Sequence, residues 1–257
     1  MLILPNAWDV ASAKIIEQAG FNAVATTSAG VAWSLGYADG ERIPRDEMLR
    51  AVERIARAVE VPVSADLEAG YGETPKAVAE TMRLAIEAGA VGVNFEDGTQ
   101  RADTPLRDIE LQIEMIQAIR EAARAAKVPL VINARTDTYL RGVGDEGTRF
   151  AETVRRANAY LQAGADCAFV IGLRQGEVIA RLAPAIQGPL NILAGAGAPT
   201  LPELGRMGVR RVSFGSGPMA ASLAFLQQLA NELREQGTYS ALTQNRINHA
   251  GMNRLLA

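Results

Sequence analysis

The chain has 257 residues, of which 48% are apolar and 21% are charged, and its formal net charge is -3. A chain of this length and composition buries a large core and folds as a globular protein. Its single Cys and single His exclude a Cys/His zinc site and a disulfide framework, which leaves carboxylates, Arg and hydroxyls for any catalysis.

Charge and hydropathy exclude two kinds of partner. The 26 basic and 29 acidic residues form no basic stripe, so we expect no nucleic-acid binding. No apolar stretch approaches the ~20 residues that span a bilayer, so we expect no membrane insertion. The opening residues MLILP carry neither the basic region nor the cleavage site of a secretion signal, and the expected location is the cytoplasm.

Two alternating patterns predict the strands. In the first pattern, a helix-like stretch ends at Gly and leads into an apolar run, at residues 17–28, 86–97, 161–172 and 205–216. In the second pattern, Pro opens the strand, at residues 61–68, 128–136 and 188–195. Together with the opening segment Leu2 to Asn6, these patterns predict eight strands.

Amphipathic segments with helical spacing separate the predicted strands. They include Arg45–Val59, Thr74–Ala88, Leu106–Ala126 and Glu146–Ala163. The apolar runs are short and nearly continuous, as in parallel strands that are buried on both faces. This alternation predicts an α/β protein with a (β/α)8 TIM-type barrel.

The domain organisation follows from the same alternation. Residues 1–236 are predicted to form the barrel domain, and residues 237–257 a C-terminal helical extension too short to fold alone. The Gly-rich segment at 193–199 lacks the spacing of a GxGxxG motif and runs into Pro-Thr-Leu-Pro, which argues against a nucleotide site.

Polar residues follow four consecutive predicted strands, where the active site of such a barrel lies. They are Thr26, Thr27, Ser28, Asp66, Glu68, Glu96, Asp97, Arg135 and Asp137. The all-oxygen set Asp66, Glu68 and Glu96 would repel itself without a cation and suits a hard ion, Mg²⁺ with Mn²⁺ as a substitute. Alternatively, these carboxylates cap helices or pair with Arg135 in a purely structural role.

Four segments carry a resemblance to a known family. They are TTSAGVAWSLGYADGE (26–41), SADLEAGYG (64–72), GVNFEDG (92–98) and INARTD (132–137). Their order and spacing resemble the isocitrate lyase/phosphoenolpyruvate mutase superfamily, in particular its phosphoenolpyruvate phosphonomutase-like branch. The likeness extends from Leu4 to about Ala220.

The resemblance implies a modified TIM barrel that assembles as a homo-oligomer, a dimer or tetramer, with helix 8 exchanged between subunits. It also implies Mg²⁺ bound mainly by Asp66, with Glu68 and Glu96 acting largely through coordinated waters. The substrate implied is a small 2-oxo acid or dicarboxylate, whose enolate the metal stabilises.

The same resemblance implies roles for the residues around the metal. Thr27 and the backbone N–H groups of Ser28 and Ala29 would grip the substrate carboxylate. Arg135 would contact the oxygens of the 2-oxo acid or its enolate, and Asp39 would lie over the substrate.

The segment after the fourth strand, EDGTQRADTPLRD (96–108), departs from the family pattern. The isocitrate and methylisocitrate lyases carry Lys-Cys-Gly-His there, and the mutases and phosphonopyruvate hydrolases a Lys and an Asn. In this chain the segment 96–108 contains no Cys, His, Lys or Asn. Arg101, Asp103 and Thr104 are the polar candidates on this expected lid over 98–108, with Arg101 as the candidate catalyst.

Three functions remain open from the sequence. The first is a Mg²⁺-dependent lyase that cleaves a carbon–carbon bond of a small 2-oxo acid or substituted malate, by retro-aldol cleavage or decarboxylation. The second is carbon–phosphorus chemistry, as phosphonopyruvate hydrolase or phosphoenolpyruvate mutase. The third is a non-catalytic 2-oxo-acid-binding protein.

Overall fold

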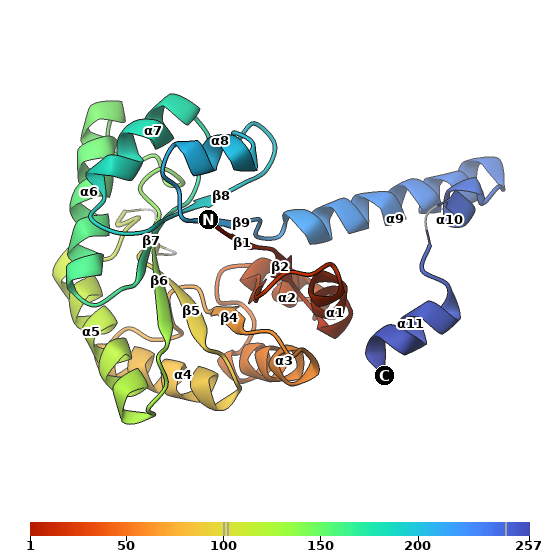
Figure 1. The fold of residues 1–257 in the computed structure, drawn as a ribbon, viewed down its shortest axis with the longest axis horizontal. Helices are drawn as coiled ribbons and strands as arrows, with labels where there is room; N and C mark the ends of the chain where they lie inside the picture. The colour runs from red at the N-terminus through yellow and green to blue at the C-terminus, as the bar shows by residue number, and fades with distance from the viewer. Residues whose placement is uncertain (100, 102, 245) are drawn as a thin grey trace.

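A computed structural model describes residues 1–99, 101, 103–244 and 246–257. All strands belong to one parallel sheet in the order β1-β9-β8-β7-β6-β5-β4-β3-β2, a nearly closed barrel with helices around it (Figure 1). The strands are β1 Leu2–Leu4, β2 Asn6–Ala7, β3 Val24–Thr26, β4 Val63–Asp66, β5 Gly92–Glu96, β6 Val131–Thr136, β7 Cys167–Val170, β8 Leu190–Leu193 and β9 Arg211–Ser213. The predicted TIM-type barrel is confirmed.

The helices follow the strands in chain order. They are α1 Val10–Gln18, α2 Ser28–Ser34, α3 Arg45–Ala58, α4 Pro75–Glu87, α5 Ile109–Ala125, α6 Glu146–Gln162, α7 Gly176–Ala185, α8 Leu201–Arg206, α9 Gly217–Gln236, α10 Ser240–Gln244 and α11 His249–Leu256. The segment predicted as helical from Leu106 becomes helical only at Ile109. The Asp108 carboxylate accepts hydrogen bonds from the N–H groups of Glu110 and Leu111 and so fixes the N-terminus of α5.

The first predicted strand is divided at Pro5, which gives nine strands instead of eight. Pro5 has no N–H to donate to a ladder, so pairing stops there and resumes on the other side. β1 pairs with β9 and β2 pairs with β3, both in parallel. One continuous segment of chain thus joins the two edges of the sheet and closes the barrel.

Predicted turn positions are confirmed where the helices end. Gly20, Gly89, Gly164 and Gly208 all have positive φ, the conformation that terminates a helix without a steric cost to glycine. Each allows the chain to turn from a helix into the next part of the barrel.

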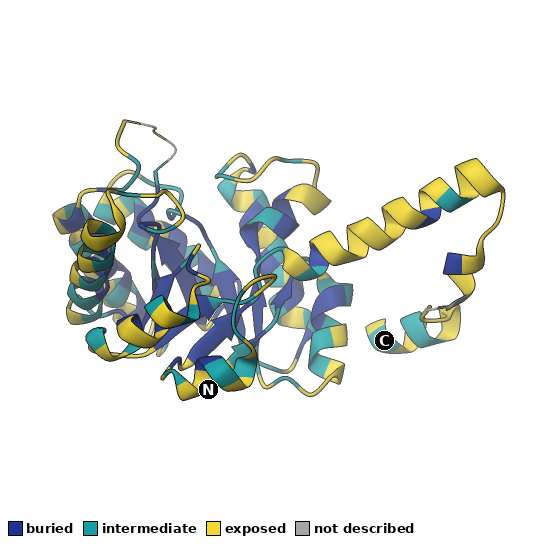
Figure 2. Ribbon diagram, turned by 90° about the horizontal axis from the view of Figure 1, so that it is seen from above, coloured by how far each residue is buried: buried dark blue, intermediate teal, exposed yellow. Residues whose placement is uncertain are grey.

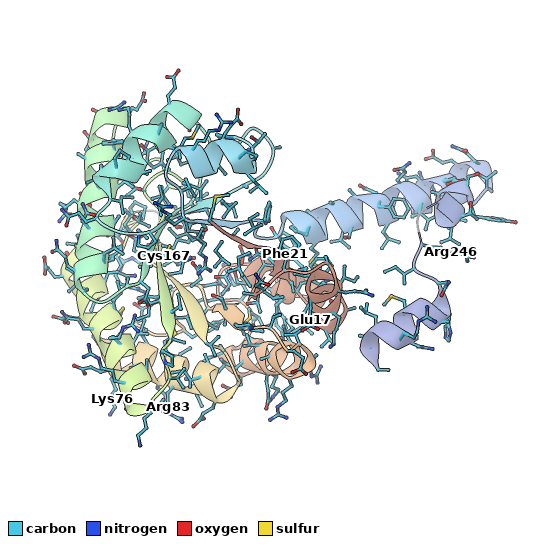
Figure 3. The ribbon with its side chains drawn as sticks, viewed as in Figure 1. Glu17, Phe21, Lys76, Arg83, Cys167 and Arg246 are labelled. Atoms are coloured by element: carbon cyan, nitrogen blue, oxygen red, sulfur yellow. The ribbon has the colours of Figure 1, made fainter. Side chains whose placement is uncertain are left out.

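Three apolar clusters fill the space between the barrel and its helices. The largest surrounds β4, β5 and β6 and contains Val93 and Phe95, the second lies around β7, β8 and β9, and the third lies under α1 and α3. Figure 2 shows this buried layer around the strands. Cys167 lies inside the barrel on β7, whereas Lys76 and Arg83 point outward from α4 (Figure 3).

The C-terminal helices stand apart from this core. α9 starts beside β2 and then projects away from the barrel, with most of its length exposed (Figures 1 and 2). It ends at Gly237, which has φ +66°, and α11 returns to contact α1. Within the described residues, no helix has the length and hydropathy needed to cross a membrane.

Asn6 forms hydrogen bonds with residues on both sides of the point where the barrel closes, on β3 and just after β9. Its removal is expected to destabilise the barrel. Its amide donates to the Thr26 carbonyl at 2.8 Å, and its Oδ1 accepts the N–H groups of Phe214 and Gly215, each at 2.8 Å. Asn6→Ala leaves these backbone groups unpaired and should lower the free energy of unfolding by about 2 kcal/mol. Urea denaturation measures it, with the exposed Asn22→Ala as the control; equal stability of the two variants would contradict this role.

Candidate active site

The carboxyl ends of the strands enclose a cavity of about 190 Å³. Of the nine residues that were given a role from the sequence, six line it, namely Thr27, Ser28, Ala29, Asp39, Asp66 and Arg135, and Thr26 of β3 lines it as well. Glu68, Glu96 and Arg101 do not line it. The barrel thus brings most of the predicted site together and leaves three predicted residues outside the cavity wall.

Asp66, the last residue of β4, is held from two neighbouring strands. The N–H and the hydroxyl of Ser28 both donate to Asp66 Oδ2 at 2.9 Å, and Asn94 on β5 donates to Oδ1 at 2.8 Å. The Asp66 N–H donates to Thr26 Oγ1 at 2.8 Å. These bonds fix the carboxylate at the edge of the cavity.

Thr27, Ser28 and Ala29 stand at the start of α2. Thr27 is the N-cap residue, with extended backbone, and its Oγ1 accepts the Gly30 N–H at 3.4 Å. The Ser28 N–H, expected to face a substrate carboxylate, is directed to Asp66 in this structure.

Arg135 ends up between two carboxylates. Its Nη1 lies 2.5 Å from Glu96 Oε2, and its Nε and Nη2 donate to the two oxygens of Asp137 at 2.7 and 3.0 Å. Burial alone lowers the pKa of Arg135, but Glu96 and Asp137 outweigh it and raise that pKa above its ordinary value. The guanidinium is therefore a permanently charged group with a fixed orientation.

A buried network of hydrogen bonds fixes the backbone of Asp137. The Asp137 N–H donates to Asp97 Oδ1 at 2.9 Å, and Asp97 Oδ2 accepts from Tyr160 at 2.7 Å and from Arg156 at 3.2 Å. Arg156 also donates to the Arg107 carbonyl at 2.9 Å. The orientation of Arg135 is thus linked to α6 and to the segment that leads into α5.

Glu68, two residues after the end of β4, sits in a strained and crowded position. Its backbone has φ +51°, and its Oε2 accepts the Glu41 N–H at 2.7 Å. Burial, followed by the charges of Asp66 and Asp39, raises the pKa of Glu68 to about 8. Its other oxygen is buried without a hydrogen-bond partner among the described residues.

Asp39 and Arg101, both candidate catalytic residues, lie in different environments. Asp39 lines the cavity, and partial burial together with the nearby Asp66 raises its pKa. The Arg101 side chain is 71% exposed and pairs with Asp103 at 3.1 Å. Gln100 and Ala102, which also belong to the expected lid over 98–108, lie outside the described residues.

The carboxylates at the carboxyl ends of the strands offer the oxygen donors that a hard divalent cation prefers, but they do not form a cluster. Within the described chain, no three His, Cys, Asp or Glu side chains converge closely enough to hold a metal by themselves. Glu96 is turned to Arg135, and Glu68 is turned to Glu41. The unpartnered oxygen of Glu68 and its raised pKa still mark an excess of negative charge beside Asp66.

The polar residues inside the barrel were not predicted from the sequence. Asn133 on β6 donates to Asn94 Oδ1 at 3.0 Å, which continues the chain of hydrogen bonds that reaches Asp66. Arg211 on β9 also lines the cavity, is 6% exposed and donates to Ser64 at 3.4 Å. Period-two alternation along each strand, Asn94 with Glu96 and Asn133 with Arg135, is the signal that could have found the two asparagines.

The fold and this mouth define a class of barrel enzyme with carboxylates and a fixed guanidinium at the carboxyl ends of its strands. The model of the phosphoenolpyruvate phosphomutase family matches residues 1–234, and the chain belongs to this family, within the phosphoenolpyruvate mutase/isocitrate lyase superfamily. The resemblance inferred from the sequence motifs is confirmed.

Three individual proteins illustrate the relationship. The 2-methylisocitrate lyase of Escherichia coli K12 is 31% identical over 239 residues, which cover 90% of this chain and 79% of that protein. The 2,3-dimethylmalate lyase of Eubacterium barkeri is 27% identical over 266 residues, covering 100% of this chain and 89% of that protein. A Burkholderia cenocepacia J2315 structure, provisionally described as a lyase/mutase, has a TM-score of 0.91 at 42% identity and covers 98% of this chain and 90% of its own.

Gly98 leaves no room for a side chain beside the Arg135 cluster. A Cβ at Gly98 would lie 2.5 Å from Asp137 Oδ2. Gly98→Ala should therefore displace Asp137 and lower the free energy of unfolding by roughly 1–3 kcal/mol, the usual cost of overpacking.

Chemical denaturation measures this effect. Gly217→Ala is the matched control, since a Cβ there meets no atom within 4 Å. If Gly98→Ala were as stable as the control, the close packing against Asp137 would not matter.

Proposed function

We propose that the chain is a Mg²⁺-dependent lyase that cleaves a carbon–carbon bond in a small 2-oxo acid or substituted malate. The observation that carries the proposal is that Asp66 and Arg135, the candidate metal ligand and a fixed cation, line one small cavity. The names of the relatives support it, since the two curated enzymes are lyases of 2-methylisocitrate and 2,3-dimethylmalate.

In this proposal Asp66 is the direct metal ligand, with Glu68 and Glu96 acting through coordinated waters. Mg²⁺ suits the oxygen-only donors, and Mn²⁺ could replace it. When bound, the ion stabilises negative charge that develops on a substrate oxygen as the bond breaks. The network of Ser28 and Asn94 around Asp66 keeps its carboxylate in one orientation for this task.

The remaining residues bind and orient the substrate. Thr27 and the N–H groups of Ser28 and Ala29 hold its carboxylate at the start of α2, for which the Ser28 N–H must turn from Asp66. Arg135 supplies a fixed positive charge to the oxygen at C2. Because Glu96 and Asp137 already orient the guanidinium, little reorganisation is needed as charge develops there. Asp39 lies over the substrate from the loop after α2.

The remaining candidate catalyst lies on the segment after β5. Gly98 and Leu106 of this segment pair in an antiparallel bridge. Arg101 is the candidate catalyst, and because its guanidinium stays protonated it would act through its charge on developing negative charge. Its side chain now faces solvent and pairs with Asp103, so it must approach the cavity to take this role.

A product-resolved assay tests the reaction. Purified protein is incubated with oxaloacetate, 2-methylisocitrate, 2,3-dimethylmalate and phosphonopyruvate, each with MgCl2 or with EDTA. We expect Mg²⁺-dependent carbon–carbon cleavage of at least one of the first three. Release of phosphate or formation of phosphoenolpyruvate from phosphonopyruvate instead supports carbon–phosphorus chemistry, the alternative that the family name favours.

Asp66→Ala separates a catalytic protein from a binding protein and tests the metal ligand. It should abolish both turnover and the Mg²⁺-dependent rise in melting temperature with oxalate or pyruvate. Asp46→Ala, on the exposed start of α3, is the control. Mg²⁺-dependent ligand binding by Asp66→Ala would refute the site assignment, and binding without turnover in the wild-type protein would favour the non-catalytic alternative.

We also propose that the protein is a homo-oligomer in which α9, the eighth barrel helix, packs against a neighbouring subunit. Only Met219 and Leu229 of α9 are buried, whereas Leu223, Phe225 and Leu226 are 39–56% exposed. An apolar groove of about 490 Å³ lies between α1, α2 and α3, with Leu256 of α11 in its wall, on the side to which α9 projects. A second copy of α9 would cover both apolar surfaces.

A charge on the apolar face of α9 should disrupt this assembly. Leu226→Asp is expected to shift the mass in light scattering to that of a monomer, because it places a carboxylate in an apolar interface. Gln227→Asp, the adjacent exposed residue, should keep the wild-type mass. A monomeric wild-type protein would contradict the proposal outright.

A further inference from the structure

Arg211 on β9 is a buried cation in the wall of the cavity. It lines the cavity together with Ser213, two positions along the same strand, whereas Val212 between them belongs to the apolar cluster between barrel and helices. Alternation along the strand therefore directs the Arg211 side chain into the barrel. Only 6% of this residue is exposed.

The Arg211 guanidinium has few hydrogen-bond partners, although an arginine offers several N–H donors. Its Nη2 donates to Ser64 Oγ at the long distance of 3.4 Å. Its Nε is buried and has no hydrogen-bond partner among the described residues. The guanidinium has therefore lost most of its hydration without replacing it, which is unfavourable for a charged group.

Two other buried arginines are paired with carboxylates. Arg135 pairs with Glu96, and Arg156 pairs with Asp97. In the part of the chain that the structure describes, no carboxylate lies within ion-pair distance of Arg211. Its positive charge is thus buried in a polar cavity without a counter-ion from the protein.

The two groups that attract Arg211 from a distance do not neutralise it. Burial lowers the pKa of Arg211, and Cys167 and Asp66 oppose this shift. Burial raises the pKa of the Cys167 thiol to about 12, so the thiol is neutral at physiological pH. Asp66 accepts hydrogen bonds from Ser28 and Asn94 and is the candidate metal ligand. An anion that enters the cavity would therefore find the Arg211 charge unpaired.

Arg211 lies deeper in the barrel than the candidate metal ligand. Ser64, which accepts from Arg211, precedes Asp66 by two positions on β4, and both line the cavity. A strand rises about 3.3 Å per residue, so the Ser64 and Asp66 side chains start roughly 7 Å apart. One small diacid spans this separation, with one carboxylate near Asp66 and Arg135 and the other near Arg211.

The charge of the cavity favours a carboxylate over a phosphonate as the second anion. One carboxylate neutralises one guanidinium, and its two oxygens match the fork of the N–H groups. A phosphonate carries more negative charge at neutral pH, and the excess would lie beside Asp66 and Asp39, which line the same cavity.

We propose that Arg211 is a specificity-determining residue that binds the second carboxylate of a diacid, so that the cavity takes a substituted malate or a 2-oxo diacid in preference to a monocarboxylic 2-oxo acid. The inference rests on the proposed function, because the first carboxylate must be held near Asp66 and Arg135 for the second to reach Arg211. It selects the diacids among the substrates that the proposed function leaves open.

Calorimetric titration in MgCl2 with two matched pairs of acids tests the inference. 2-Oxoglutarate and 2-oxopentanoate have equal carbon chains, as do malate and 2-hydroxybutanoate, and in each pair the first ends in a carboxylate and the second in a methyl group. Pyruvate is the short reference. We expect the diacid to bind more tightly by at least about tenfold in one pair or both, because hydrogen bonds to a charged group have this strength.

Two variants of Arg211 and a matched control locate the effect. Arg211→Met should reduce the diacid preference to less than about twofold and leave pyruvate binding unchanged, without lowering the melting temperature, because it removes a buried charge that has no partner. Arg211→Lys keeps the charge and should retain part of the preference. Arg210→Met makes the same substitution at the adjacent, exposed arginine and should bind all the acids like the wild-type protein.

The outcomes distinguish the two proposals. Mg²⁺-dependent binding of pyruvate without a diacid preference in either pair would overturn the role of Arg211 and leave the proposed function intact. A preference that persists in Arg211→Met would also overturn that role, and so would a marked loss of stability in this variant, which would show that the guanidinium has a structural partner. No Mg²⁺-dependent binding of any of these acids by the wild-type protein would overturn the proposed function and the inference with it.

Discussion

The ion-pair cluster of Arg135 with Glu96 and Asp137 is the interaction on which the candidate site depends. Three charged side chains can be buried at the end of a barrel only because each neutralises another and because Asp97, Tyr160 and Arg156 satisfy the groups behind them. Burial lowers the dielectric response around the cluster, so the guanidinium and its two carboxylates hold one another in a fixed orientation at the edge of the cavity.

The cavity itself depends on the unusual interior of this barrel. Inward positions that could be filled with branched apolar side chains are occupied by Asn94, Asn133 and Arg211. Asn133 donates to Asn94 and Asn94 donates to Asp66, so these two hydrogen bonds fix the Asp66 carboxylate. The apolar packing that stabilises the fold lies instead outside the strands, which separates the residues of the site from those of the core.

Much of the fold could be predicted from the sequence because its signals are local. Gly20, Gly89 and Gly164 end helices through their own backbone conformation, and the prolines before β4 and β8 need no distant partner to exert their effect. The division of the first strand at Pro5 was missed because the missing donor matters only once two different strands lie on either side of it. The projection of α9 from the barrel was not predicted from the sequence.

The sequence by itself determined the alternation of strands and helices, and with it the edge at which Asp66 and Arg135 meet. Only the tertiary structure decided which group each carboxylate contacts. Glu96 turns to Arg135 and Glu68 to the Glu41 N–H, although both follow strands whose carboxyl ends lie beside Asp66. The same holds for apolar residues, since Phe169 and Ile192 look alike in sequence and are assigned to cavity lining or apolar cluster only by the face of the strand on which they lie.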